Sequence, residues 1–413
     1  MELSLVERQR GLRALLVFTF FMVSGFTLVM PLVAVHFVNT LGWAAATVGL
    51  ALAVRQLTQQ GLALVAGSLT DRIGARQLLC GGVLLRAVGF ASLAWANTIP
   101  SLFAALVVSA LGGALFEVPY QASIAMLTTD ESRPRYYALS NLVSGVATTL
   151  GPLIGVWLLR FDFQWVCLSA AACFLVTFVI AVLVLPAVRT ANSSSKLGAG
   201  YVLVLRDRRF LALTALLMGY WFVAVQINIS LPIMVERLTG SSDGVGVMFA
   251  LNAGMTVCLQ YPMIRLLEPR LSARAILVIG VGLMALSMGA VGLIDNFSLL
   301  LGCVGFFAFG SLLTRPTQQS LTIALADSQA LGTYLGVSSL ALAIGGGLGN
   351  GIGGWLIDLA QAHALPLLPW LVFAAVGLVS AIGLVLLPLP TPKLNSAAAT
   401  ETHSEGETTA ATA

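Results

Sequence analysis

Long apolar segments recur along almost the whole chain and are separated by short polar stretches. A bilayer core of about 30 Å requires roughly 20 apolar residues per helix. Twelve segments meet this requirement: 12–38, 45–69, 78–97, 100–127, 137–160, 163–187, 209–237, 243–268, 274–293, 297–325, 332–360 and 367–388. Because backbone groups in lipid must satisfy one another, such segments form helices rather than open strands. The pattern predicts an all-α integral membrane protein with twelve transmembrane helices.

A polar interval divides the twelve predicted spans into two sets of six. A shift of 197 residues aligns five residues of the first half with identical residues of the second. Gly113, Pro119, Gln121, Asp130 and Tyr137 align with Gly310, Pro316, Gln318, Asp327 and Tyr334. Parallel repeats of this kind are typical of secondary transporters that alternate access around a central site. We therefore predict two pseudo-symmetric six-helix bundles, 1–188 and 209–388, a cytoplasmic linker, 189–208, and a disordered cytoplasmic tail, 389–413.

Composition and charge support a membrane location. Of 413 residues, 58% are hydrophobic and 9% are charged, which excludes a water-soluble globule of this length. Most of the 21 Lys and Arg residues fall in segments that a cytoplasmic amino terminus would place inside; Arg160 and Arg237 fall outside. The positive-inside rule then predicts cytoplasmic termini in a bacterial-type inner membrane, without any nucleic-acid partner. The expected partners are the bilayer and a small-molecule substrate, and the expected state is a monomer.

The segment GSLTDRIGARQ, residues 67–77, is expected to form a cytoplasmic loop between the second and third spans. It resembles the signature loop of the major facilitator superfamily, G-x-L-x-D-R-x-G-R-R/K, and departs from it at Ala75. The resemblance implies a gating loop in which Asp71 accepts a hydrogen bond from the start of helix 11. In the same scheme an arginine pairs with Asp130 or Glu131. The gating residues implied are Gly67, Asp71, Arg72, Gly74 and Arg76.

A second motif lies in the fifth span, in GVATTLGPLIG. It looks like the motif of drug/proton antiporters of this superfamily, with Gly145, Gly151, Pro152 and Gly155. The same residues also suit close helix packing and a kink. Residues 41–62, 231–235 and 340–349 are most similar to the MdtH-type multidrug-resistance branch. The arginine that many antiporters carry in helix 4 is replaced by Ser109, so the usual proton relay does not transfer to this chain.

The candidate chemistry rests on one buried acid. The sequence contains no ATP-binding loop, and its three scattered histidines suit neither a metal site nor a catalytic triad. We therefore expect no enzyme activity and no cofactor, with protons as the coupling ion. Of the seventeen carboxylates, Glu117 alone falls deep in a span, which predicts a role in proton coupling. Arg55, Arg86 and Arg315 share the membrane interior, and at least one of them is expected to pair with Glu117.

Polar stripes on helices 4 and 10 predict one central cavity. Gly113, Glu117 and Gln121 recur at steps of four, so they share one helix face. The residues expected to line the cavity are Arg315, Gln121, Thr314, Gln318, Gln226, Asn228, Tyr220, Trp221, Phe26, Met22 and Asn252. Aromatic and methionine walls with a single acid suit amphipathic or cationic compounds. The sequence thus favours a proton-coupled exporter of small drug-like molecules; the alternatives are a transporter of one metabolite, such as a sugar, siderophore or amino acid, or a non-transporting receptor.

Overall fold

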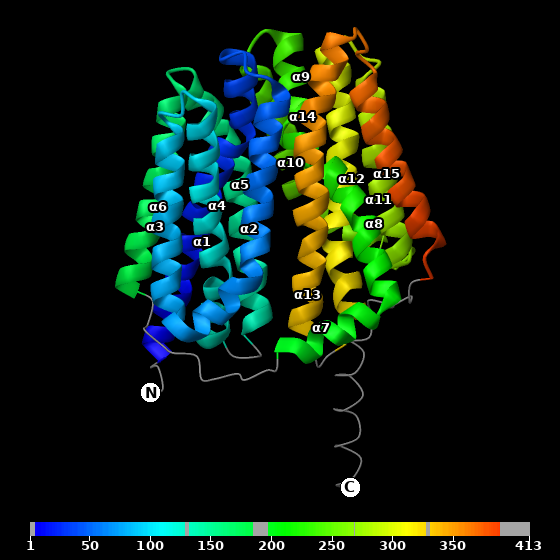
Figure 1. The fold of residues 1–413 in the computed structure, drawn as a ribbon. Helices are drawn as coiled ribbons and strands as arrows, with labels where there is room; N and C mark the ends of the chain where they lie inside the picture. The colour runs from blue at the N-terminus through cyan, green and yellow to red at the C-terminus, as the bar shows by residue number, and fades with distance from the viewer. Residues whose placement is uncertain (1–4, 129–131, 185–196, 268, 328–330, 389–413) are drawn as a thin grey trace.

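The computed structural model describes residues 5–128, 132–184, 197–267, 269–327 and 331–388. Every regular element in these ranges is helical, as predicted. Eleven helical segments are long and apolar enough to cross a membrane. The 29-residue helix α2 is not among the eleven but runs beside them (Figure 1). The helices therefore correspond closely to the twelve predicted spans.

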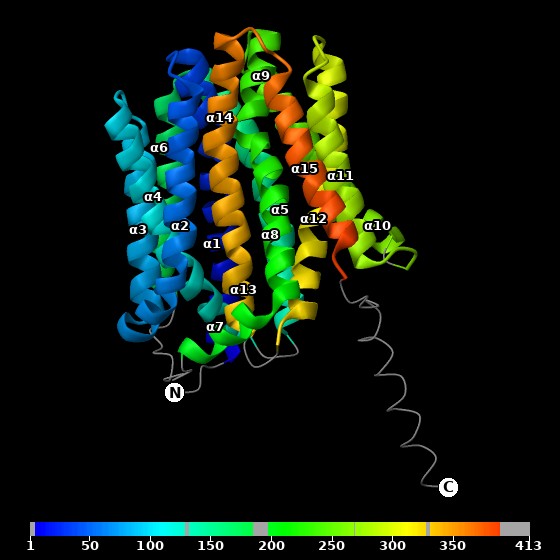
Figure 2. The same ribbon diagram turned by 45° about the vertical axis from the view of Figure 1, so that its right-hand side comes forward.

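The first six long helices pack against one another as one group, in which α1 contacts α5 and α6, α2 contacts α4, and α3 contacts α4 and α6. Their bounds are α1 (Leu5–Ala34), continued by the π-helix η1 (Val35–Thr40), α2 (Ala45–Ile73), α3 (Ala75–Leu93), α4 (Ile99–Leu127), α5 (Arg133–Leu159) and α6 (Phe163–Val184). The chain's two ends, the start of α1 and the end of α15, lie at the same end of the molecule (Figures 1 and 2). We call this the proximal end and the opposite one the distal end.

The second group contains two spans that are interrupted in mid-course. The first comprises α8 (Arg208–Ala224), the 3₁₀-helix η2 (Val225–Asn228) and α9 (Ser230–Thr239). The second comprises α13 (Leu331–Leu340), the π-helix η3 (Ala341–Gly346) and α14 (Gly347–Ala362). The remaining helices are α10 (Asp243–Leu267), α11 (Ala273–Val291), α12 (Phe297–Leu325) and α15 (Leu368–Leu386). Such local breaks are common at functional sites of helices.

A short helix that the sequence did not predict lies in the linker. Helix α7 (Leu197–Arg206) falls within the predicted 189–208 segment and lies across the proximal end (Figures 1 and 2). It is followed directly by α8, whose N-terminus is capped by Asp207 through hydrogen bonds from the Arg209 and Phe210 amides. The cap satisfies two amides that the helix itself leaves free.

The predicted loop at residues 67–77 is mostly helical, so this prediction was wrong. Helix α2 continues to Ile73 and α3 begins at Ala75, so Gly74 alone separates them. Its φ of 101° is accessible to glycine and strained for other residues. The backbones of Gly67, Asp71 and Arg72 lie in α2, while the expected partners of Asp71 and the arginines fall partly outside the described residues. Arg76 donates a hydrogen bond to the carbonyl of Val182 in α6.

The two groups are related by a shift of 198 residues rather than 197. Helices α2 and α10 begin at Ala45 and Asp243 (243 − 45 = 198), and the same interval separates the starts of α3 and α11 and the starts of α4 and α12. Packing supports this register: a Cβ at Gly112 would overlap the carbonyl of Gly82, and a Cβ at Gly310 would reach the carbonyl of Gly280. Glu117 therefore corresponds to Arg315, not to Thr314.

Candidate substrate site and distal gate

A cavity of about 410 Å³ lies among α1, α2, α3, α4 and α5. It is lined by Phe18, Thr19, Met22, Val23, Phe26, Gln59, Arg86, Phe116, Glu117, Tyr120, Gln121, Ile124, Tyr137, Ser140, Asn141 and Ser144. Glu117 and Gln121 lie toward the end of α4, and the α5 residues lie toward its start, so the cavity occupies the proximal half of the molecule. We call it the Glu117 cavity; the predicted residues that it brings together are Met22, Phe26, Arg86, Glu117 and Gln121.

Glu117 presents its carboxylate to this cavity. Its side chain is exposed although it lies deep within α4, because the exposed surface faces the cavity. Within the described ranges, the carboxylate makes no ion pair or hydrogen bond. An acid in this position can exchange a proton or a ligand with the cavity without first breaking a salt bridge.

Two buried arginines stand beside Glu117. Arg86 is 4% exposed and lines the cavity, and Arg55 is 8% exposed behind it. The Arg86 guanidinium lies 5.0 to 5.7 Å from the ring centroids of four phenylalanines, Phe26, Phe90, Phe116 and Phe174. Arg55 lies 5.2 Å from the centroid of Phe26 and donates to Gln59 at 3.0 Å. Cation–π contacts thus stabilise both charges where ion pairs do not.

The predicted stripe on α4 has three different uses. A Cβ at Gly113 would overlap Arg86 Nη1 and lie 2.8 Å from the Gln59 side chain, so Gly113 makes room for the guanidinium. Glu117 faces the cavity, and Gln121 accepts a hydrogen bond of 3.0 Å from the Tyr137 hydroxyl. Along this face of α4, Gly113 thus contacts the buried Arg86, Glu117 faces the cavity, and Gln121 belongs to its polar wall.

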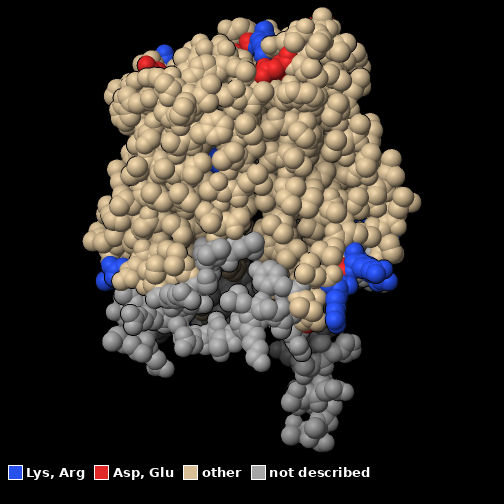
Figure 3. Space-filling model, in the orientation of Figure 1, with Lys and Arg blue, Asp and Glu red and all other residues tan. Residues whose placement is uncertain are grey.

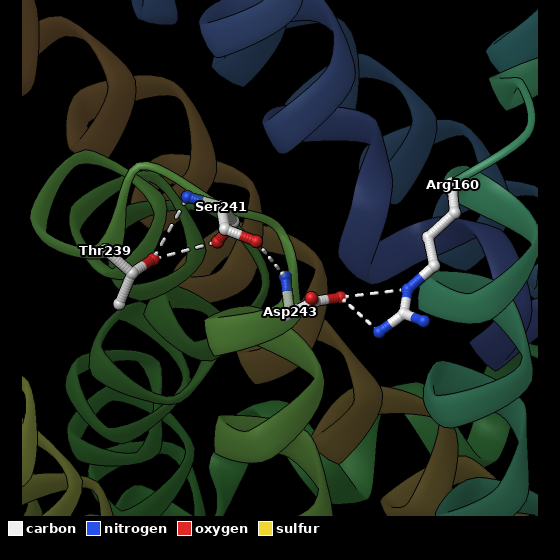
Figure 4. A network of polar contacts seen from close by, with 4 residues as sticks. All are labelled: Arg160, Thr239, Ser241 and Asp243. Atoms are coloured by element: carbon white, nitrogen blue, oxygen red, sulfur yellow. Dashed lines mark hydrogen bonds and ion pairs between the residues drawn. The ribbon is translucent and has the colours of Figure 1, made fainter.

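The distal end is closed by contacts between the two helix groups. Asp358 of α14 accepts hydrogen bonds from the Ala45 and Ala46 amides at 3.0 and 2.7 Å, so a carboxylate caps the start of α2. Asn39 donates to Glu236. Arg160 pairs with Asp243 at 2.9 Å, and Ser241 in turn accepts from the Asp243 amide (Figure 4). We call these three interactions the distal contacts.

Two of the distal contacts are related by the 198-residue shift. Asp358 corresponds to Arg160, and Ala45, the first residue of α2, corresponds to Asp243, the first residue of α10. In each contact, the far end of one helix meets the start of a helix from the other group. The charges differ: a carboxylate meets free amides in one contact, and an arginine meets a carboxylate in the other.

Comparison with known proteins identifies the family. The family model described as Major Facilitator Superfamily matches residues 15–242 and 221–410. The chain belongs to the major facilitator superfamily. The Multidrug resistance protein MdtH of Yersinia enterocolitica serotype O:8 / biotype 1B (strain NCTC 13174 / 8081) is 40% identical over 384 residues, which span 92% of this chain and 96% of the relative. A Yersinia pestis (strain Pestoides F) protein of the same name gives the same identity and coverage.

Solved structures show the same fold. A POT family transporter in complex with 5-aminolevulinic acid superposes with a TM-score of 0.77 at 17% identity, covering 94% of this chain and 97% of that one. A POT family transporter with a thioalcohol conjugated peptide also gives 0.77, at 16% identity, covering 91% and 96%. Because the family model and the MdtH relatives match most of the chain, this member of the major facilitator superfamily is a transporter, not an enzyme, as the sequence predicted.

Two predicted cavity residues of this superfamily member are structural instead. Thr314 is fully buried, donates to the Gly310 carbonyl at 2.8 Å and packs against Gly280 of α11. Gln226 is also fully buried; its amide donates to the Phe222 and Gly349 carbonyls, and its oxygen accepts from Ser230. Gln226 therefore joins the break at η2 to α14, and neither side chain is open to a ligand.

The other carboxy-terminal candidates do not line the Glu117 cavity. Arg315 is exposed on α12 and lies beside the buried Tyr220. Trp221 packs against the core. Asn228, Asn252 and Gln318 are partly exposed. A second cavity, of about 740 Å³, lies at the distal end and is lined by C-terminal-group residues including Arg237 and Trp370.

The antiporter-like motif packs α5 against α1. A Cβ at Gly151 would overlap Thr27, and one at Gly155 would overlap the Leu28 carbonyl, while Gly145 faces open space. Pro152 is buried within α5. The motif lies on the α1–α5 contact, which agrees with the packing interpretation.

Several functional residues were not anticipated from the sequence. Gln59, Tyr120, Tyr137 and Ser140 line the cavity, and Asp358 caps α2. The sequence could have indicated Gln59, because Gln59 lies four residues after Arg55 and therefore shares a helix face with it. For Asp358 no local signal exists, since its partners lie more than 300 residues away.

We expect Asp358 and Arg160 to differ in their contributions to distal closure. Removing a side chain that caps a helix costs about 1 kcal/mol, whereas a pair whose side chains are 60% and 55% exposed contributes less than about 0.5 kcal/mol. Val156 of α5 is 6% exposed and packs against Gly246 of α10 across the closed end. Val156→Cys therefore reports opening once the native cysteines, including the exposed Cys258, are replaced by serine. Its alkylation should accelerate about fivefold in Asp358→Ala and less than twofold in Arg160→Gln. Equal rates in the two variants would contradict this ranking.

Proposed function

We propose that the protein is a proton-driven antiporter that exports small amphipathic molecules, including drug-like compounds. The proposal rests on the position of Glu117, whose side chain lies inside the membrane and faces a cavity. Among the described residues, its carboxylate has no ion-pair partner. Buried carboxylates in transporters commonly exchange protons. The relatives named multidrug resistance protein support the substrate class, because they match nearly the whole chain.

The distribution of charge supports an orientation with the proximal end in the cytoplasm. Charged side chains on the face shown in Figure 3 lie almost only at the two ends. Exposed arginines of α7, α8 and the α10–α11 turn lie proximally, Arg206, Arg208, Arg209, Arg265 and Arg270. The positive-inside rule then assigns this end to the cytoplasmic side of the inner membrane, as the sequence suggested.

In this orientation the structure corresponds to an inward-facing state. The distal contacts close the outer end, and the Glu117 cavity lies in the cytoplasmic half. Binding of a substrate from the cytoplasm and protonation of Glu117 from the outside would then compete at one site. Alternation between the two ends requires the distal contacts to break and equivalent contacts to form at the proximal end.

Everted membrane vesicles containing the protein test the direction of coupling. Ethidium is added outside, on the side of the proximal end, and a pH gradient is imposed across the membrane. Antiport predicts severalfold accumulation when the lumen is acidic, abolished by nigericin and absent from vesicles without the protein. Accumulation driven by acid outside would indicate symport, and accumulation that is independent of pH would contradict proton coupling.

A further inference from the structure

We propose that the Glu117 cavity binds amphoteric molecules, with the ligand's acidic group at Arg86 and its cationic group at Glu117. The proposal rests on the proposed transport function and names the substrate class of the same site. It narrows the amphipathic or cationic cargo that the sequence suggested to molecules that carry both charges. Its basis is the juxtaposition of two unpaired buried cations and one unpaired acid around a single cavity.

The arginines lack an anion. Arginine is charged at any pH that the protein meets, and both Arg55 and Arg86 are buried. Neither forms an ion pair with a carboxylate in the described ranges. The Nε and Nη1 atoms of Arg86 and the Nε atom of Arg55 are buried without hydrogen-bond partners. Buried donors of this kind are costly unless an acceptor arrives, which makes a ligand anion the expected partner.

The Arg86 guanidinium is held in place before any ligand arrives. Four aromatic rings surround it, and Gly113 leaves the space that Nη1 occupies. Gln59, which also lines the cavity, uses its oxygen to accept from Arg55, so its amide nitrogen remains as a further donor. A fixed guanidinium beside a second donor suits the two oxygens of a carboxylate.

Glu117 supplies the opposite charge in the same cavity. No ion pair joins Glu117 to Arg86 although both line the cavity, so each can accept a ligand group of opposite charge. A purely cationic ligand would satisfy Glu117 and leave the arginines without an anion. A purely anionic ligand would do the reverse. A molecule that carries both charges satisfies both sides, and Phe18, Phe26 and Phe116 provide an apolar wall for its body.

A matched pair of fluorescent dyes tests the proposal on the unaltered protein. Rhodamine 110 carries a free carboxylate beside its cationic ring system, and rhodamine 123 is its methyl ester. Fluorescence polarisation with the purified protein at pH 7.5 should show at least about tenfold tighter binding of rhodamine 110, because the ester offers no charge to Arg86. Equal binding, tighter binding of the ester, or binding of neither dye would overturn the proposal.

Variants of Arg86 test whether this residue causes the preference for rhodamine 110. Arg86→Gln should reduce the affinity for rhodamine 110 to that for rhodamine 123, and Arg86→Lys, which keeps the charge but not the fork, should retain part of the preference. Arg270→Gln, at an exposed position outside the cavity, should behave as wild type. A full preference in Arg86→Gln would show that another group reads the carboxylate.

The result of the dye-binding test can be distinguished from the result of the vesicle test of proton antiport. If ethidium accumulates in acid-loaded vesicles while the two dyes bind alike, proton antiport stands and the anion subsite is wrong. If the dye preference is found but ethidium accumulation does not depend on the pH gradient, the subsite stands and the coupling is wrong.

Discussion

The Glu117→Gln variant is expected to exchange ethidium across the membrane but to lose accumulation driven by a pH gradient. Glutamine keeps the shape of the side chain and its hydrogen-bonding capacity, so the cavity should still bind and release substrate, although more weakly because the negative charge that faces a cation is lost. It cannot release a proton, so substrate movement is no longer tied to proton movement. Accumulation in everted vesicles with an acidic lumen should fall at least tenfold, while exchange of labelled for unlabelled ethidium should persist.

Asp295→Asn is the matched control for this experiment. Asp295 is exposed in the distal turn between α11 and α12, and the substitution removes the same charge far from the Glu117 cavity. Its proton-driven accumulation should equal that of the wild type. Unchanged pH-driven accumulation in Glu117→Gln would show that another group couples the proton.

Gly354→Ala is expected to prevent closure of the distal end. A Cβ at Gly354 of α14 would overlap the Ala45 carbonyl of α2, and one at Gly49 of α2 would overlap the Asn350 carbonyl of α14. Because the obstructing atoms belong to the backbone, the overlap is relieved only if the two helices separate. These helices belong to different groups, so each group can still fold while the closed state becomes inaccessible.

Transport and labelling distinguish this effect from misfolding. Gly354→Ala should reduce ethidium accumulation at least tenfold and accelerate alkylation of Val156→Cys by a similar factor. Gly351→Ala is the control, because a Cβ there would lie 3.7 Å from Ala53, an ordinary contact. It should transport like the wild type. Slow alkylation together with full transport in Gly354→Ala would mean that the α2–α14 contact tolerates the methyl group.

The sequence predicted the spans well because apolar length determines them. It failed at residues 67–77, where polar side chains suggested a loop although nothing in Leu69–Ile73 ends a helix. The backbone turn at Gly74 is confined to one residue, and composition does not show where such a turn begins.

The site was harder to predict because it depends on register and on distant contacts. The 197-residue shift aligns scarce residues such as Pro119 and Pro316, whereas helix starts and glycine contacts follow 198. This one-residue error assigned Thr314 to the cavity. Glu117 could be found because acids are rare inside spans. Its relation to Arg86 could not, because helix packing rather than spacing along the chain brings α3 beside α4.

The difference between the two distal contacts favours packing of the amino-terminal half against the carboxy-terminal half over packing of either half against its own copy. In an assembly of two amino-terminal halves, Arg160 would face the free amides at the start of the partner's α2, where the helix dipole repels a cation. Two carboxy-terminal halves would bring Asp358 toward Asp243, and like charges would meet. Only the mixed pairing places a carboxylate at the free amides in one contact and an arginine at a carboxylate in the other. After duplication, divergence at these four positions would favour assembly of one half with the other over assembly with its own copy.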